Sequence, residues 1–276
     1  MKVSLIIAVY KDYEALDIIL EQLLVQTYKD FEVIVAEDAC GDGIYSILNK
    51  YDDLEITHLS QEDKGIRKMR SQNRAVKAAK GEYLIFIDGD CIPYHNFIEA
   101  HVLSASEGIV LSGRRVNLGP RYSQGIRDGK ISSEDVSRNY LKHFFPIFLD
   151  GKEGHAESGF SFPVGGIVDR FIISKLSRST SILGCNFSCY KDDIISINGF
   201  DESYGETAIG DDTDIEWRFL IYGMKLKSVK NFANVFHLYH EKRNRVFKDY
   251  DEKLELMRDR KQKGLFRAAS GLDEMS

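Results

Sequence analysis

Residues 83–90 read Tyr83-Leu-Ile-Phe-Ile-Asp-Gly-Asp90, which joins a short apolar run to two aspartates. A run of this length and composition is typical of a β-strand that is buried on both faces. The two carboxylates that follow it repel each other, and a divalent cation such as Mg²⁺ or Mn²⁺ would relieve that repulsion. The alternative is a solvated turn, where Asp and Gly are common. The position directly after a buried strand favours the cation site.

Similar strand patterns lie on the amino-terminal side of this stretch and alternate with helical ones. Alternation of this kind predicts an α/β fold with a mostly parallel sheet that is covered by helices. Ligands of such sheets bind beyond the carboxyl ends of the strands, which here carry Tyr10, Asp38 and Asp88 to Asp90. The expected strands are 3–9, 31–36, 54–59 and 83–87, and the expected helices are 12–26, 44–50 and 67–80.

Composition excludes several classes of protein. The 276 residues carry 37 Lys and Arg against 43 Asp and Glu, so we expect no nucleic-acid partner, because binding to phosphates needs clustered cations. The longest near-apolar run, residues 3–10, is far below the roughly 20 residues of a membrane span and has no features of a secretory signal. Four Cys without a CxxC pair argue against a zinc or redox site, and the reduced cytoplasm is the expected location.

The remainder of the chain is less regular. Residues 114–180 are rich in Gly, Ser and charge, which indicates an insertion of short helices and loops. Regular patterns resume near residue 182, and 229–235 reads as a short strand. Beyond residue 241, an expected helix places four apolar side chains on one face that packs on the body, namely Phe247, Tyr250, Leu254 and Met257.

A second acidic cluster opens an expected helix at residues 210–218. Thr213 and Glu216 match a capping box, and acidic residues such as Asp214 suit a helix start. This reading leaves Asp211 and Asp212 unexplained. A carboxylate at this place can serve as a general base toward a substrate hydroxyl.

Two histidines three residues apart, His237 and His240, follow the expected strand 229–235. They are candidates for metal ligation or for a phosphate contact, although such pairs are more often incidental. The basic residues Lys242, Arg243 and Arg245 would suit a diphosphate, and the alternative is a solvated basic run. Asn186 and Ser188 are candidates for contacts to sugar hydroxyls.

Taken together, these segments resemble family 2 glycosyltransferases of the GT-A fold, an α/β Rossmann-like fold with a small antiparallel part on the acceptor side. The likeness covers roughly residues 1–115 and 180–240, and the later part resembles bacterial chondroitin-polymerase-like enzymes and β-1,4-galactosyltransferases. The segments that carry it are Val3–Tyr10, Glu37-Asp38, Gly81–Cys91, Gly184-Cys-Asn186, Asn198–Glu202 and 210–214.

The resemblance implies a role for each matching residue. Asp212 would be the catalytic base, with Asp211 as its acidic neighbour, and Asn186 and Trp217 would contact the acceptor or sugar. Asp90 and His240 would bind the metal, with His237 as the alternative ligand. The residues implied to bind the nucleotide sugar are Ala8, Val9, Tyr10, Asp38, Arg67, Asn73, Asp88, Gly89 and Asp90.

Two features depart from the family pattern. The uracil-contact turn reads Glu37-Asp-Ala-Cys40 instead of Asp-Asp-Gly-Ser, and Gln72 precedes Asn73 where the family often has Arg. Arg67 or Arg70 would then supply the positive charge that this Arg provides in the family. These departures bear on the nucleotide base more than on the reaction type.

The implied activity is transfer of a sugar, with inversion and with Mn²⁺ or Mg²⁺, from a nucleotide-diphosphate donor, UDP-sugar above all, to a surface-polysaccharide or lipid-linked glycan. Such an acceptor would bring the enzyme to the inner face of a membrane. We expect a catalytic domain over 1–240, made of 1–115, a variable insertion 116–180 and 181–240, and a helical tail 241–276. The alternatives are a sugar nucleotidyltransferase, which the absence of a Gly-rich phosphate loop disfavours, and a non-catalytic glycan-binding module.

Overall fold

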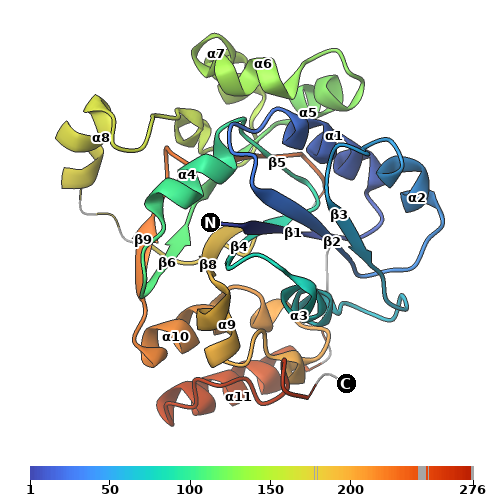
Figure 1. The fold of residues 1–276 in the computed structure, drawn as a ribbon, viewed down its shortest axis with the longest axis vertical. Helices are drawn as coiled ribbons and strands as arrows, with labels where there is room; N and C mark the ends of the chain where they lie inside the picture. The colour runs from blue at the N-terminus through green and yellow to red at the C-terminus, as the bar shows by residue number, and fades with distance from the viewer. Residues whose placement is uncertain (177, 179, 242–246, 248, 275–276) are drawn as a thin grey trace.

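A seven-stranded sheet forms the centre of the molecule, with helices on both faces (Figure 1). The computed structural model describes residues 1–176, 178, 180–241, 247 and 249–274. The strand order is β3-β2-β1-β4-β8-β6-β9. The strands are β1 (Val3–Val9), β2 (Phe31–Glu37), β3 (Ile56–Leu59), β4 (Tyr83–Asp88), β6 (Ile109–Ser112), β8 (Asn186–Tyr190) and β9 (Lys225–Ser228).

Most of the pairings in this sheet are parallel, which confirms the predicted α/β class. Strand β8 alone runs antiparallel, to β4 on one side and β6 on the other. In the parallel register Ala8 lies opposite Asp88 and Val9 lies opposite Glu37. The carboxyl ends of β1, β2 and β4 therefore meet at one edge of the sheet.

A second, three-stranded sheet begins where β4 ends. It has the order β5-β10-β7, with β5 (Cys91–Pro93), β10 (Asn234–His237) and β7 (Arg114–Asn117). The strand predicted at 229–235 was wrong in position. Residues between β9 and β10 form a turn in which Asn231 has a φ of 70°, so His237 closes a strand instead of following one.

The alternating side chains of the central strands build a core on each face. Leu5 and Ile7 pack with α1 and α4 on one face, whereas Ile6 packs with α3 and α10 on the other. The helices are α1 (Tyr13–Leu24), α2 (Gly43–Leu48), α3 (Lys68–Ala78), α4 (Phe97–Ser104), α5 (Pro120–Arg127), α6 (Ser133–Arg138), α7 (Tyr140–Asp150), α8 (Ile167–Phe171), α9 (Lys191–Ser196), α10 (Thr213–Tyr222) and α11 (Tyr250–Gln262), with 3₁₀ turns η1 (Ala156–Gly159), η2 (Ile173–Lys175), η3 (Glu202–Tyr204) and η4 (Ala208–Gly210).

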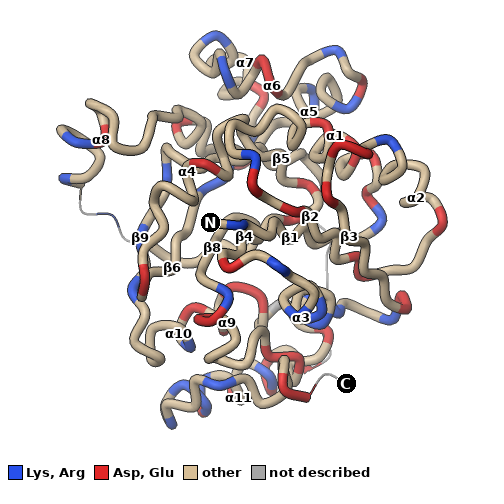
Figure 2. The backbone as a smooth tube through the Cα atoms, in the orientation of Figure 1, with Lys and Arg blue, Asp and Glu red and all other residues tan. Residues whose placement is uncertain are grey.

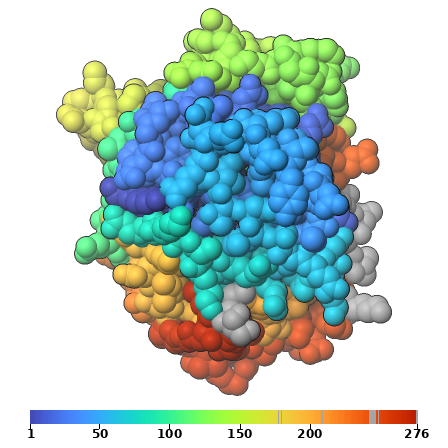
Figure 3. Space-filling model, turned by 45° about the vertical axis from the view of Figure 1, so that its right-hand side comes forward, coloured from blue at the N-terminus to red at the C-terminus, as the bar shows by residue number. Residues whose placement is uncertain are grey.

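The segment predicted as an insertion is built of short helices, as expected. Helices α5 to α8 lie at one end of the molecule, and α10 and α11 lie at the other (Figures 1 and 3). The proposed subdivision of the chain at residues 115, 180 and 240 stays a prediction. Within the described ranges no helix is long and apolar enough to cross a bilayer.

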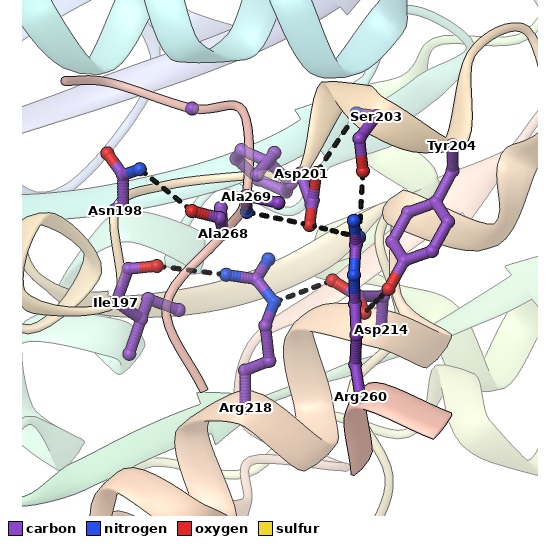
Figure 4. A network of polar contacts seen from close by, with 12 residues as sticks. Ile197, Asn198, Asp201, Ser203, Tyr204, Asp214, Arg218, Arg260, Ala268 and Ala269 are labelled. Carbon is purple, nitrogen blue, oxygen red and sulfur yellow. Dashed lines mark hydrogen bonds and ion pairs between the residues drawn. The ribbon is translucent and has the colours of Figure 1, made fainter. Parts of the chain in front are cut away.

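The capping box predicted for α10 does not form. Asp212 is the N-cap residue, so Thr213 is the first residue of the helix, and the carboxylate of Glu216 instead accepts a hydrogen bond from Ile182 N at 2.6 Å. Asp214 is fully buried, where it pairs with Arg218 Nε at 2.6 Å and accepts a hydrogen bond from Tyr204 Oη at 2.7 Å (Figure 4). The acidic side chains at this helix start therefore serve packing and contacts to other segments, and none of them caps the helix.

This buried network fixes the start of α10 to the carboxyl-terminal segment. Arg218 also donates to the carbonyls of Ile197 and Gly199, and Arg260 of α11 pairs with Asp201 at 2.8 Å (Figure 4). Breaking a buried ion pair by removing one partner costs about 3–5 kcal/mol, because the remaining charge is uncompensated. The network thus holds the segment that carries Asp211 and Asp212 in place.

Helix α11 packs on the body through two of the four apolar residues that the sequence indicated, and Phe247 precedes the helix. Met257 is buried in a cluster with Tyr204 and Trp217, and Leu254 packs against the same cluster. Tyr250, at the first turn of the helix, is exposed.

Candidate active site

A cavity of about 790 Å³ opens at the carboxyl edge of the central sheet. Its walls come from the ends of β1, β2, β4, β7 and β10, the start of α3, and the residue before the N-cap of α10. Seven of the nine residues predicted to bind a nucleotide sugar line it: Ala8, Val9, Tyr10, Asp38, Asp88, Gly89 and Asp90. The sheet register explains this grouping, because these residues end adjacent strands.

Asp38 is fixed at the end of β2 by two hydrogen bonds. Its carboxylate accepts one from Gln61 Nε2 at 2.6 Å and one from Arg67 N at 2.7 Å. Burial raises the pKa of Asp38, while both hydrogen bonds lower it. Arg67 therefore acts here through its backbone; its guanidinium donates to the carbonyl of Glu62, and the residue does not line the cavity.

Gly89 allows the ends of β1 and β4 to approach closely. Its N–H donates to the carbonyl of Ala8 at 2.8 Å, and a Cβ at this position would lie 2.9 Å from the same oxygen. A side chain here would push the strands apart. The glycine thus keeps Asp88 and Asp90 at the edge of the cavity.

Asp90, His237 and His240 form a candidate metal centre. One ligand atom from each lies within 4.8 Å of the others, and Asp90 Oδ2 is 3.6 Å from His237 Nε2 and 3.5 Å from His240 Nε2. Burial lowers the pKa of His237, and the neighbouring Arg115 lowers it further, although Asp90 raises it. A neutral imidazole is the form that binds a metal. One carboxylate with two imidazoles fits a transition metal such as Mn²⁺ better than Mg²⁺, which prefers oxygen ligands.

Lys68 is one residue of this site that the sequence interpretation missed. Its Nζ lies 2.6 Å from Asp88 Oδ1 and 2.6 Å from Asp211 Oδ2, so it bridges the two acidic clusters. Burial lowers the pKa of Lys68, but the two carboxylates raise it well above its ordinary value. The helical spacing held a signal, because Lys68 precedes the buried Gln72 and Val76 by one and two turns.

Asp211 is the member of the second acidic cluster that lines the cavity. Burial raises its pKa to about 6, although the Lys68 ammonium opposes this shift. Oδ1 of Asp211 has no hydrogen-bond partner within the described part of the chain. Gly184 leaves room for it, because a Cβ there would lie 2.7 Å from this oxygen.

Asp212 lies beside Asp211 but outside the cavity lining. As the N-cap residue of α10 its side chain caps no backbone N–H, and it accepts a hydrogen bond from Thr213 Oγ1 at 3.2 Å. Asp212 therefore lacks the ion pair with Lys68 that holds its neighbour.

Arg115 of β7 is a second residue that the sequence interpretation did not single out. It lines the cavity, and its charge acts on both Asp90 and His237. No spacing in the sequence marked it, because β7 was read as the start of the irregular insertion. The basic residues Lys242, Arg243 and Arg245 lie outside the described residues.

Four predicted contact residues are in the core instead of the cavity. Asn186 is fully buried, with Nδ2 donating to the carbonyls of Arg114 and Ala233 and Oδ1 bonded to His101 Nε2. Ser188, two residues along β8, bonds to the Tyr83 hydroxyl and to His101. These polar groups are paired inside the protein, so they are not available to a sugar.

Asn73 and Trp217 are likewise structural. Asn73 is fully buried and brackets Phe200, donating to its carbonyl at 2.9 Å and accepting from its N–H at 2.8 Å. Trp217 is buried in the cluster that receives α11. Asn73 therefore supports the Asn198–Glu202 turn, and Trp217 packs α10 against α11.

Replacing Lys68 should impair the site while preserving the fold. In Lys68→Met, Asp88 and Asp211 lose their shared cation, so the pKa of Asp211 rises further and the carboxylate is partly protonated at neutral pH. An opposite charge at this distance changes a pKa by about 1–3 units, so we expect kcat/KM to fall by about 10- to 100-fold. The exposed Lys77→Met on the same helix is the control, and steady-state kinetics with circular dichroism is the measurement. Equal kinetics in the two variants would show that the bridge has no role.

Two family models match this sequence. The family described as "Glycosyl transferase family 2" matches residues 4–163, and that described as "N-terminal domain of galactosyltransferase" matches residues 173–241. Among curated relatives, the UDP-Glc:α-D-GlcNAc-diphosphoundecaprenol β-1,3-glucosyltransferase WfaP of Escherichia coli is 38% identical over 89 residues, which are 32% of this chain and 35% of that protein. The poly(ribitol-phosphate) β-glucosyltransferase of Bacillus spizizenii is 34% identical over 96 residues, or 33% of this chain and 15% of that protein. The chain thus spans about a third or less of these two relatives.

Two solved structures show the same architecture. The mannosyltransferase PcManGT from Pyrobaculum calidifontis, in complex with GDP-Man and Mn²⁺, superposes with a TM-score of 0.56 at 15% identity, over 98% of this chain and 65% of that one. Residues 1–349 of TarS from S. aureus, in complex with UDP-GlcNAc, give 0.59 at 17% identity, over 99% and 69%. At such low identity the likeness shows the fold alone.

Proposed function

Because the chain belongs to glycosyl transferase family 2 and is a glycosyltransferase, we propose that it moves a sugar from a UDP-sugar to a hydroxyl of a surface-polysaccharide or lipid-linked glycan, with inversion and with Mn²⁺. Glucose, galactose and N-acetylhexosamines are the proposed sugars. The UDP-GlcNAc complex of TarS and the lipid-diphosphate acceptor in the name of WfaP support this choice.

One observation carries the proposal: a single cavity is lined by the candidate metal centre and by Asp211 of the second acidic cluster, and Lys68 lies between Asp88 and Asp211. Transfer of a sugar from a diphosphate requires charge neutralisation at the leaving group and proton removal at the acceptor. The two clusters are chemically suited to these two tasks.

In this proposal the chain's own residues divide the work. Asp38 holds the nucleoside at the end of β2, and Asp88 lies at the end of β4 beside it. Arg115 faces the diphosphate from β7. Asp212 takes the proton of the acceptor hydroxyl, and Asp211, held by Lys68, orients that hydroxyl through its unpaired oxygen.

The metal centre would be held by Asp90, His237 and His240. When bound, a divalent cation supplies positive charge that stabilises the departing diphosphate. Burial lowers the pKa of His237, so its imidazole is neutral and able to bind a metal at neutral pH.

Two other functions were compatible with the sequence. The family match now places the chain among glycosyltransferases and not among nucleotidyltransferases. A binding module without activity would have no use for a candidate metal centre and Asp211 in one cavity. Such a module would be recognised by binding to a glycan without binding to a nucleotide.

A donor panel tests the proposal. Thermal unfolding is followed with Mn²⁺ and with UDP-, GDP- or dTDP-sugars, since a ligand that binds the native state raises the melting temperature. We expect the largest increase with a UDP-sugar. A higher melting temperature with GDP-sugars alone would change the assigned nucleotide from UDP to GDP. No increase in melting temperature with any donor would contradict the proposed function.

A further inference from the structure

Exposed apolar side chains are concentrated on one part of the described chain. The five most exposed large apolar residues, between 66% and 80% accessible, all lie on α7 and α8: Leu149, Ile167, Leu141, Phe145 and Phe171. Phe148, Ile172 and Leu176 add to the same surface. These side chains gather at one end of the molecule, and a concentration of exposed apolar residues marks an interaction site, whereas single scattered ones do not. We call these eight residues the α7–α8 surface.

Helix α7 is apolar on two opposite faces. Its inner face packs in the core through Ile147, which is fully buried, and Tyr140, whose hydroxyl donates to the carbonyl of Ala156. Its outer face carries Leu141, Phe145 and Leu149 at intervals of four residues. A helix that packs only on its own protein has a polar outer face, so the outer stripe is not explained by the fold.

Helix α8 shows the same feature more strongly. None of its residues, Ile167–Phe171, is buried, although it begins and ends with large apolar side chains. Figures 1 and 3 show α8 projecting from the body at the end that also carries α7. Core packing therefore does not account for its composition.

The charges around this surface identify its partner. Lys142, Arg170 and Lys175 are exposed on or beside the two helices. Figure 2 shows blue basic segments at α7 and at α8. The carboxylates of Asp150 and Asp169 lie here too and each accepts a hydrogen bond from a backbone N–H at 2.8 Å, so the three cations exceed these two anions. Apolar side chains interspersed with cations suit the interface of an anionic bilayer. A second copy of the chain would bring the same cations together.

We propose that the α7–α8 surface docks the protein on an anionic lipid bilayer. Lys152 and Glu153, just beyond the end of α7, line the cavity, so docking would hold the cavity close to the headgroups. The benefit to a lipid-linked acceptor rests on the proposed function; the docking itself does not.

Sedimentation with vesicles tests the proposal. The full chain is mixed with vesicles of phosphatidylcholine alone or with phosphatidylglycerol added, and the bound fraction is measured. We expect binding to the anionic vesicles, a loss of at least about tenfold in Phe145→Ser/Leu149→Ser, and a loss of the anionic preference in Lys142→Glu/Lys175→Glu. The matched control, Leu220→Ser/Ile221→Ser, changes two exposed apolar residues of α10 at the other end of the molecule and should bind like wild type.

Three outcomes would overturn the proposal. The first is a wild-type chain that stays in the supernatant, and the second is a Phe145→Ser/Leu149→Ser variant that binds like wild type. The third is self-association in sedimentation velocity that this variant abolishes without any lipid binding, which would make a second copy the partner. Transfer to a water-soluble acceptor, measured in parallel, separates this test from the proposed function. If the chain is inactive but binds vesicles, the docking proposal stands and the proposed function fails. If the chain is active but does not bind vesicles, the docking proposal fails and the proposed function stands.

Discussion

Asp90→Asn should lower the rate of sugar transfer by on the order of 10³-fold, because a metal ion contributes several kcal/mol to stabilising the transition state. The substitution removes the carboxylate from the candidate metal centre and leaves only His237 and His240. The side chain keeps its size, so the end of β4 should keep its structure. The rate is measured at increasing Mn²⁺, where the variant should need far more metal for any residual activity.

Asp42→Asn provides the matched control for this experiment. Asp42 is an exposed carboxylate before α2 that makes no capping hydrogen bond, so its removal changes the net charge equally without touching the cavity. It should transfer sugar at the wild-type rate. An unchanged dependence on Mn²⁺ in Asp90→Asn would remove this residue from the metal centre.

Asp212→Asn and Asp211→Asn should separate proton transfer from positioning. A positioned general base typically contributes about 10²- to 10⁴-fold, so Asp212→Asn should lose that factor in kcat while its donor affinity stays unchanged. Asp211→Asn leaves Lys68 with Asp88 as its remaining ion-pair partner, so it should also change the affinity for the donor.

Steady-state kinetics and donor titration of both variants decide between the two carboxylates. If Asp211→Asn loses kcat at unchanged donor affinity and Asp212→Asn does not, the base is Asp211. That result would agree with the position of Asp211 in the cavity and with its pKa of about 6. Wild-type turnover in both variants would place proton removal elsewhere.

The residues at the carboxyl edge of the sheet were predictable because its central strands have a recognisable apolar pattern in the sequence. The apolar runs of β1, β2 and β4 have no alternation, which is typical of strands buried on both faces, and in a parallel sheet their ends must align. Tyr10, Asp38 and Asp90 therefore came together as expected. The short strands β5, β7 and β10 gave too few residues for a pattern.

Burial of single polar residues was harder to predict. Asn186 and Asn73 have the chemistry of sugar-binding residues, but amides satisfy buried backbone groups equally well, and only the packing distinguishes the two uses. Conversely, the spacing of Lys68 from Gln72 and Val76 puts it on the buried face of α3 but does not show which carboxylates it meets. Its role depends on the rotation of the helix relative to the sheet, which turns it toward Asp88 and Asp211.

Release of nucleoside diphosphate in the presence of Mn²⁺ and a glycan acceptor, and its loss on chelation, tests the central claim most directly. We expect acceptor-dependent release from a UDP-sugar that stops in EDTA, returns with added Mn²⁺ and is absent in Asp90→Asn. Release that continues undiminished in EDTA and in Asp90→Asn would contradict the assignment of a metal-assisted transferase to this cavity.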